Sequence, residues 1–178
     1  MGKAQALGSV LDAAVLLQAK AANVTFILLG GGVEVERLKA LAVQKLLSNV
    51  VFLPAVPMTE VGTYLAAADA LLVHLKKDPL FTITIPSKTQ AYMASGKPML
   101  MAVDGDAADL VLDSGCGVVA ESQNPQSIAN AALALMQASQ SERDSMAEKG
   151  LRFYREKLSL HEGVRRFGVI FQQLAKRK

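Results

Sequence analysis

The sequence predicts a doubly wound α/β fold, in which a parallel β-sheet carries helices on both faces. Short apolar runs rich in strand-forming residues alternate with longer segments whose apolar residues recur at helical spacing. The apolar runs are continuous, which is typical of strands buried on both faces. Glycine and proline fall at the ends of these segments and no linker is visible. The 178 residues are therefore predicted to form one Rossmann-like domain, residues 1–178.

The first 75 residues are predicted to contain three helices and three strands. A helix is predicted over 4–21, where the apolar residues are Leu7, Val10, Leu11, Ala14 and Leu17. The remaining segments are a strand at 24–29 closed by a glycine triplet, a helix at 33–47 with charges on one side, a strand at 50–53 stopped by a proline, a helix at 59–67 with Thr59 as its N-cap, and a buried strand at 70–75.

The rest of the chain repeats the alternation and then ends in helices. Residues 76–86 lack periodicity and are predicted to be irregular. The later elements are a helix at 87–95 stopped by Gly96, strands at 98–103 and 117–120, a short helix at 105–113, and closing helices at 125–138, 142–158 and 161–176. Folds of this kind usually begin with a strand that becomes central in the sheet, whereas this chain begins with a helix. We therefore expect a fragment that lacks its first strand.

Composition excludes several classes of protein. A single cysteine, Cys116, excludes an internal disulfide and a cysteine zinc cluster. No apolar run approaches the roughly 20 residues of a membrane span, and the N-terminus lacks the pattern of a signal peptide. A cytoplasmic location is predicted. Nucleic acid is not an expected partner, because the chain has no Trp and no aromatic residues alternating with basic ones.

The positive charge is concentrated near the C-terminus. Residues 141–178 hold ten Lys or Arg and five Asp or Glu, a balance of +5, so the other residues balance to −2 within the net charge of +3. One interpretation is a solvated helical face. The other is peripheral contact with anionic lipid head groups, at the inner face of the membrane.

A ligand site is predicted beyond the carboxyl ends of the strands, where open α/β sheets bind their ligands. The segments that follow the predicted strands are 30–32, 54–57, 76–88 and 104–106. The glycine triplet Gly30–Gly32 is compatible with backbone contact to a phosphate and equally with a tight turn. His74 closes an apolar strand, so it is either a packed histidine or a ligand contact.

The strongest candidate is the helix start at Ser87, Lys88 and Thr89. Free N–H groups and a partial positive charge at a helix N-terminus suit a diphosphate, and Lys88 adds a full charge. The alternative is an ordinary capped helix with an exposed lysine. No Ser/His/Asp or metal-ligand grouping is present, and no residue is nominated as a general base.

The segment 86–98, Pro-Ser-Lys-Thr-Gln-Ala-Tyr-Met-Ala-Ser-Gly-Lys-Pro, resembles the donor-site helix of retaining GT-B glycosyltransferases of family four. It is most similar to the subgroup that transfers amino or deoxy sugars during O-antigen and capsule assembly. The resemblance extends over nearly the whole chain, through the segments 2–5, 26–32, 49–56, 67–70 and 115–117.

The resemblance implies the donor-binding, C-terminal half of an enzyme whose N-terminal half binds the acceptor. Its ligand would be a nucleotide sugar, UDP-linked, held without a metal or other cofactor, and the isolated chain would be inactive. The implied site residues are Ser87, Lys88, Thr89, Lys3 and Gly2 for the diphosphate, Pro54, Ala55, Val56 and Ala91 for the nucleoside, and Ile83, Thr84 and Ile85 for the sugar.

The chain departs from the family pattern at the positions of a conserved pair of glutamates. Ile83 and Ala91 stand there, and Gln5 stands where the family has a phosphate-binding lysine. Lys3 or Lys88 would replace that charge. Two other functions therefore stay open: the half of a nucleotide-sugar epimerase with GT-B architecture, and a nucleotide-binding module that does not catalyse.

Overall fold

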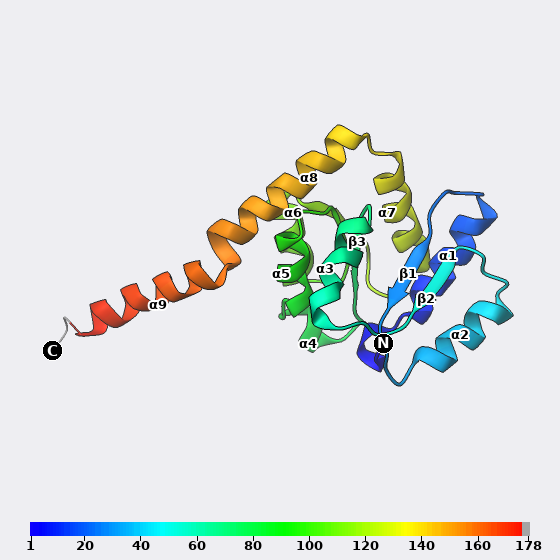
Figure 1. Cartoon of the computed structure of the whole chain (residues 1–178), viewed down its shortest axis with the longest axis horizontal. Coiled ribbons are helices and arrows are strands. Elements are labelled where there is room, and N and C mark those ends of the chain that lie inside the picture. Colours follow the sequence, from blue (N-terminus) through cyan, green and yellow to red (C-terminus); the bar gives the residue numbers. More distant parts are fainter. Residues whose placement is uncertain (176–178) are drawn as a thin grey trace.

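The computed structural model describes residues 1–175. Helices and strands alternate along the chain (Figure 1). In order they are η1 (Lys3–Gln5), α1 (Gly8–Ala19), β1 (Phe26–Leu29), α2 (Val35–Gln44), β2 (Val50–Leu53), α3 (Met58–Ala67), β3 (Leu71–His74), α4 (Pro79–Thr82), α5 (Ser87–Ala94), β4 (Met99–Ala102), α6 (Asp106–Ser114), β5 (Gly117–Val119), α7 (Pro125–Gln137), α8 (Gln140–Phe153), η2 (Tyr154–Leu158) and α9 (Leu160–Ala175).

All strand pairings within residues 1–175 are parallel, which confirms the predicted α/β class. The strands nevertheless form two separate sheets, β1-β2 and β3-β4-β5. In the first, Phe26 pairs with Val50; in the second, Leu71 pairs with Met99, which also pairs with Gly117.

One apolar layer holds the two sheets together. Helices α1 and α7 pack against each other, and their buried residues include Val10, Leu17 and Ile128. The same cluster contains Phe26 of β1 and Leu100 of β4. The first sheet therefore shares a covered face with the second, although the two exchange no strand pairing in the described part of the chain.

The sequence misplaces a few local features. The predicted first helix is broken at Ala6, whose φ of 41° separates η1 from α1. Thr59 is not an N-cap, because α3 begins at Met58 after Pro57. The segment predicted to be irregular contains α4, whose N-cap Asp78 accepts a hydrogen bond from the Leu80 N–H. The predicted last helix reaches Lys176, which lies outside the described residues.

The turn after β4 is fixed by close packing against α4. Gly105 has a φ of 78°, and a Cβ at this position would lie 2.1 Å from the carbonyl oxygen of Thr82. Only glycine therefore allows this approach, which ties the β4–α6 turn to the segment that precedes α5.

Gly105→Ala is expected to lower the free energy of unfolding by about 2 kcal/mol or more, because it adds a backbone clash to an unfavourable φ. Urea denaturation measures this. Gly62→Ala in α3 is the matched control: its Cβ would meet open space, so alanine should raise stability by about 0.5–1 kcal/mol. Equal stability of the Gly105 variant and the wild type would contradict the packing argument.

Candidate functional site

The loops that the sequence singled out follow the carboxyl ends of the strands. Gly30 follows β1, Pro54 follows β2, Lys76 follows β3 and Asp104 lies just beyond β4. Because the strands of each sheet are parallel, these ends share one edge of their sheet. The N-terminal segment lies at the same edge, since the Lys76 N–H donates to the Ala4 carbonyl at 2.8 Å.

The start of α5 offers free hydrogen-bond donors. Its N-cap is Pro86, so Ser87 occupies the first helical position and is exposed. Within residues 1–175, the N–H groups of Ser87 and Lys88 have no hydrogen-bond acceptor. In the same part of the chain, neither Lys88 nor Lys3 forms an ion pair. Two amides and two lysines are thus available to an anion.

The Thr89 side chain does not lie on the exposed surface at the start of α5. It is fully buried, and the Thr89 N–H donates to the Pro86 carbonyl at 2.9 Å. The hydroxyl has no hydrogen-bond partner in the described structure. The structure therefore does not support the sequence-based assignment of Thr89 to the diphosphate, because one turn of helix directs its side chain into the core.

The residues predicted to contact sugar and nucleoside are mostly accessible. Ile83 is 69% exposed, Ile85 is exposed, and the Thr84 hydroxyl donates to the Leu80 carbonyl at 3.0 Å. Pro54 and Ala55 are exposed and Val56 is half-buried.

Ala91 is exposed on α5, four residues after Ser87 and so on the same side of the helix. No described contact joins these groups of residues to one another, so their convergence on one ligand stays a prediction.

Gly2 and Lys3 are placed by contacts on both sides of the N-terminal segment. The Met1 carbonyl accepts from the Glu34 N–H at 3.2 Å, and the Met1 backbone lies against Gly32. On the other side, the Gln5 carbonyl contacts the His74 ring. Gly2 and Lys3 therefore lie between the carboxyl ends of β1 and β3, and Lys3 is exposed there.

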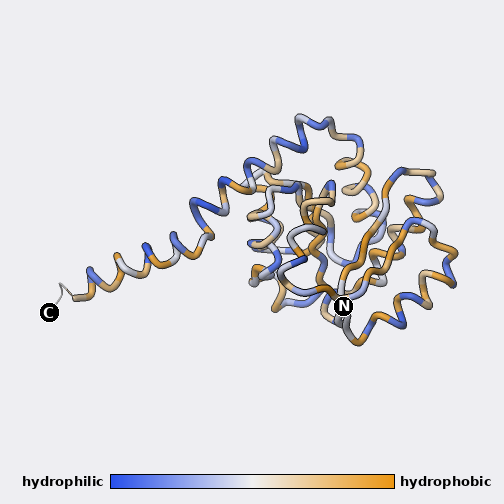
Figure 2. Tube along the Cα trace, viewed as in Figure 1, coloured by the Kyte–Doolittle hydropathy of each residue, from blue (hydrophilic) through white to orange (hydrophobic). Residues whose placement is uncertain are grey.

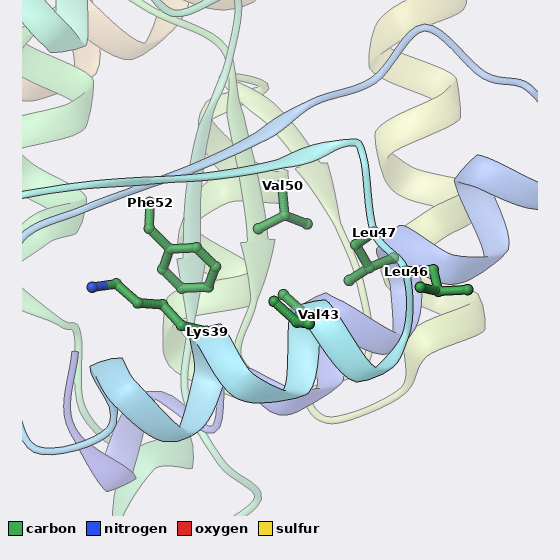
Figure 3. A pocket seen from close by; sticks show the side chains of 7 residues that line it. Lys39, Val43, Leu46, Leu47, Val50 and Phe52 are labelled. Atoms are coloured by element: carbon green, nitrogen blue, oxygen red, sulfur yellow. The ribbon is translucent and has the colours of Figure 1, made fainter.

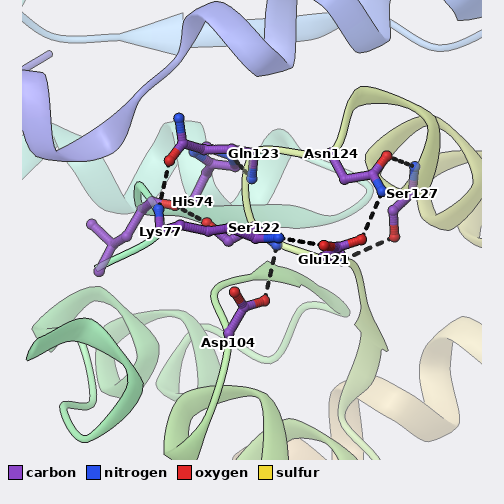
Figure 4. Close-up of polar contacts among 9 residues, drawn as sticks. His74, Lys77, Asp104, Glu121, Ser122, Gln123, Asn124 and Ser127 are labelled. Atoms are coloured by element: carbon purple, nitrogen blue, oxygen red, sulfur yellow. Dashed lines mark hydrogen bonds and ion pairs between the residues drawn. The ribbon is translucent and has the colours of Figure 1, made fainter. Parts of the chain in front are cut away.

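His74 is a packed, neutral histidine that links three segments, and Figure 4 shows it beside Gln123. Its Nδ1 lies 2.6 Å from the Gln5 carbonyl, so Nδ1 carries the proton; its Nε2 accepts from the Gln123 N–H at 3.2 Å. Burial lowers the pKa of His74, although the Gln5 carbonyl and the Asp104 carboxylate act in the opposite direction. Both ring nitrogens are occupied, which favours the packed interpretation over a ligand contact.

A polar network joins the β3–α4 loop to the β5–α7 loop (Figure 4). Lys77 forms an ion pair with Glu121, and the Lys77 N–H donates to the Gln123 side chain at 2.6 Å. The Ser122 N–H donates to the Asp104 carboxylate at 3.0 Å. Sequence reasoning missed this network. The one feature of this network that the local sequence indicates is the N-cap Asn124, whose side chain accepts a hydrogen bond from the Ser127 N–H. That N-cap does not predict the contact with Lys77.

An apolar depression lies away from this edge, between α2 and β2 (Figure 3). Its lining residues are Lys39, Ala42, Val43, Leu46, Leu47, Val50 and Phe52. None of them is a predicted site residue. Within residues 1–175, no group of three His, Cys, Asp or Glu side chains is placed to hold a metal ion.

Comparison with a known family identifies the kind of domain to which this sheet edge belongs. "Glycosyl transferases group 1" matches residues 2–153, which is most of the chain. The chain belongs to the glycosyl transferases group 1 family. One curated member, "Probable glycosyltransferase WbjE" of Pseudomonas aeruginosa, is 28% identical over 131 residues, 72% of this chain. The chain spans 32% of the length of that relative.

Two solved structures share the fold. The C-terminal domain of a glycosyl transferase group 1 family protein, LpcC of Francisella tularensis, has a TM-score of 0.70 at 18% identity and covers 90% of this chain and 84% of its own. Anabaena Alr3699/HepE, solved in complex with UDP, has a TM-score of 0.74 at 20% identity and covers 97% of this chain and 44% of its own. The architecture is that of a GT-B C-terminal domain, as predicted.

The neutral state of His74 predicts acid destabilisation. The unfolded chain binds a proton at the ordinary pKa of about 6.5, whereas burial lowers the pKa in the folded state. The contribution of neutral His74 to the free energy of unfolding is therefore fully present above about pH 6.5. Below that pH the free energy of unfolding falls, by at most about 1.4 kcal/mol per pH unit.

Denaturation between pH 7.5 and pH 5.5 measures this slope. His74→Gln is expected to flatten it, while His161→Gln, at an exposed position, should leave it unchanged. An unaltered slope in the His74 variant would contradict the assignment of the neutral ring.

Proposed function

We propose that this domain binds the nucleotide sugar of a retaining glycosyltransferase that adds a hexosamine or deoxy sugar to a bacterial surface polysaccharide. The observation that carries the proposal is the α5 N-terminus, where the exposed amides of Ser87 and Lys88 have no acceptor in residues 1–175. A helix N-terminus with such amides is an anion site. Family membership makes a sugar diphosphate the appropriate anion.

The nucleotide is proposed to be UDP. The similar fold of Alr3699/HepE was solved with UDP, which supports this choice. Lys3 and Lys88 would supply the positive charge, since Lys76 and Lys77 are engaged with Asp78 and Glu121. No divalent metal is proposed, because the amides and lysines already balance a diphosphate.

The proposed sugar and the proposed acceptor rest on the resemblance of segment 86–98 to the subgroup that transfers amino or deoxy sugars. Ile83 presents apolar surface where other members have a carboxylate near the sugar, which favours a less hydroxylated sugar. The acceptor would be held by an N-terminal domain of a longer protein, since positioning of both substrates supplies much of the rate. By itself the domain is then a binding unit without transferase activity.

Helix α9 is proposed to contact the inner, cytoplasmic face of the membrane. It has no buried residue, extends away from the body of the domain (Figure 1), and shows hydrophobic and hydrophilic residues around its turns (Figure 2). Its exposed apolar side chains recur at helical spacing: Leu160, Val164, Phe167, Phe171 and Leu174. No helix within residues 1–175 combines the length and apolarity needed to cross a bilayer.

UDP titration of three variants tests the diphosphate site. Lys88→Ala should weaken binding by about 1–2 kcal/mol if the ammonium reaches a phosphate oxygen. Ser87→Pro should weaken it more than Ser87→Ala, because proline removes an amide donor and is tolerated at the first helical position. Isothermal calorimetry measures each affinity, and a chelator should leave the wild-type affinity unchanged.

Lys20→Ala is the control for the lysine variant, since Lys20 is exposed at the C-terminal end of α1 and forms no ion pair within residues 1–175. Melting curves confirm that each variant is folded. Equal UDP affinity in the wild type and all folded variants would overturn the diphosphate site.

Vesicle sedimentation tests the membrane contact. The domain should bind vesicles that contain phosphatidylglycerol several-fold more than vesicles of phosphatidylcholine alone, because apolar burial and attraction to anionic lipid act together. Replacing Phe167 and Phe171 with serine should abolish most of that binding. The ring centroids of the two phenylalanines lie 6.2 Å apart on one side of α9. Binding that is equal for both vesicle types, or unaffected by the serines, argues against the contact.

A further inference from the structure

His74 lies where three segments of the carboxyl edge meet, and only one protonation state of its ring satisfies them. It is 4% exposed at the end of β3. Its Nδ1 lies 2.6 Å from the Gln5 carbonyl, which can only accept, and its Nε2 lies 3.2 Å from the Gln123 N–H, which can only donate. A second proton, on Nε2, would face the Gln123 N–H and break that contact.

Both partners of the ring lie at strained backbone. Gln123 has a φ of 53°, and Ala6, which follows Gln5, has a φ of 41°. Left-handed conformations cost free energy in residues that carry a Cβ, and they persist where surrounding contacts enforce them. The His74 ring supplies one such contact to each segment, so a change in the ring allows both segments to relax.

The segment on one side of the ring carries Lys3. Its turn is tied to the end of β3 at two points, because the Ala4 carbonyl accepts from the Lys76 N–H at 2.8 Å and the Gln5 carbonyl contacts His74. Lys3 lies within this turn, is exposed, and forms no ion pair within residues 1–175. The position of its ammonium therefore depends on the contacts that hold the turn.

The segment on the other side of the ring is joined to the loop that leads to α5 (Figure 4). The Gln123 side chain accepts from the Lys77 N–H at 2.6 Å, and the Lys77 side chain pairs with Glu121. The chain continues from Lys77 through α4 to Ser87 at the start of α5. His74 thus contacts one segment of the proposed diphosphate site directly and the other through Gln123.

The charges around the ring do not stabilise its protonated form enough to offset burial. Asp104 attracts a proton to His74, but its carboxylate already accepts from the Ser122 N–H, and burial has the larger effect and lowers the pKa of the ring. The other charged groups on the surrounding elements are Lys3 on η1, Lys88 on α5, and the ion pairs Lys76–Asp78 and Lys77–Glu121.

We propose that His74 is a positioning residue of the diphosphate site, and that the domain binds its nucleoside diphosphate while the ring is neutral and releases it when the ring gains a proton. This role rests on the proposed function, because Lys3 and the start of α5 would hold the diphosphate. The ring touches no ligand and acts through Gln5 and Gln123. Since ligand and proton oppose each other, affinity falls with pH, by at most about tenfold per pH unit.

Isothermal calorimetry with UDP between pH 7.5 and pH 5.0 compares the wild type with His74→Asn. Asparagine keeps a donor near the position of Nδ1, beside the Gln5 carbonyl, and cannot gain a proton. The terminal phosphate of UDP itself titrates near about pH 6, so both chains lose affinity in acid. We expect the wild type to lose at least about threefold more than the variant.

Three further variants make the result specific. His161→Asn changes the other histidine, which is exposed on α9, and should keep the wild-type profile. His74→Gln, which places its amide near the position of Nε2, should flatten the profile as His74→Asn does. In a chain that carries Lys3→Ala, His74→Asn should change the profile less, because the ring acts partly through the turn of Lys3.

Melting curves at each pH separate loss of binding from loss of the fold. Parallel profiles of the wild type and both His74 variants, with every chain folded, would overturn the role of His74 and leave the proposed function standing. If the folded wild type does not bind UDP at pH 7.5, the proposed function itself fails, and the role of His74 fails with it.

Discussion

The apolar layer formed by α1 and α7 is the constraint on which the domain depends. The two sheets are not joined by strand pairing within residues 1–175, so burial of Phe26, Leu72 and Leu100 against these helices keeps them side by side. The free energy gained by apolar burial is proportional to the apolar area removed from water and does not depend on the orientation of the groups. The geometry of the carboxyl edge must therefore come from directional contacts, and these are the hydrogen bonds of the N-terminal segment and of His74.

The ionisable side chains at this edge fall into two groups: those engaged in contacts of the fold and those available to a ligand. His74 is kept neutral by burial, and Lys77 is held by Glu121, so neither can serve a ligand without breaking a contact of the fold. Lys3 and Lys88 have no such partner in the described residues, and the α5 amides beside Lys88 are free. A diphosphate is the ligand that we propose for these groups, and the proposal is consistent with the family to which the chain belongs.

The C-terminal helix has a different electrostatic character from the basic surface that composition indicates. Arg165 and Arg166 both pair with Glu162 and hold the pKa of that carboxyl at about 2. Much of the local positive charge is thus balanced, and the exposed phenylalanines become the more distinctive feature of α9. Contact through this helix would consequently combine burial of apolar side chains with attraction to anionic lipid.

The sequence by itself determined the order of the strands and of the longer helices, the parallel class, and the edge at which we propose the site. Apolar runs such as 99–102 and the glycine and proline signals beside them are local, and they formed strands and turns as predicted. Single-sequence patterns did not reveal the break at Ala6, the burial of Thr89 or the link between Lys77 and Glu121. Only the tertiary structure decided these, and also the division into two sheets, because each depends on residues far apart in the chain that no local periodicity brings together.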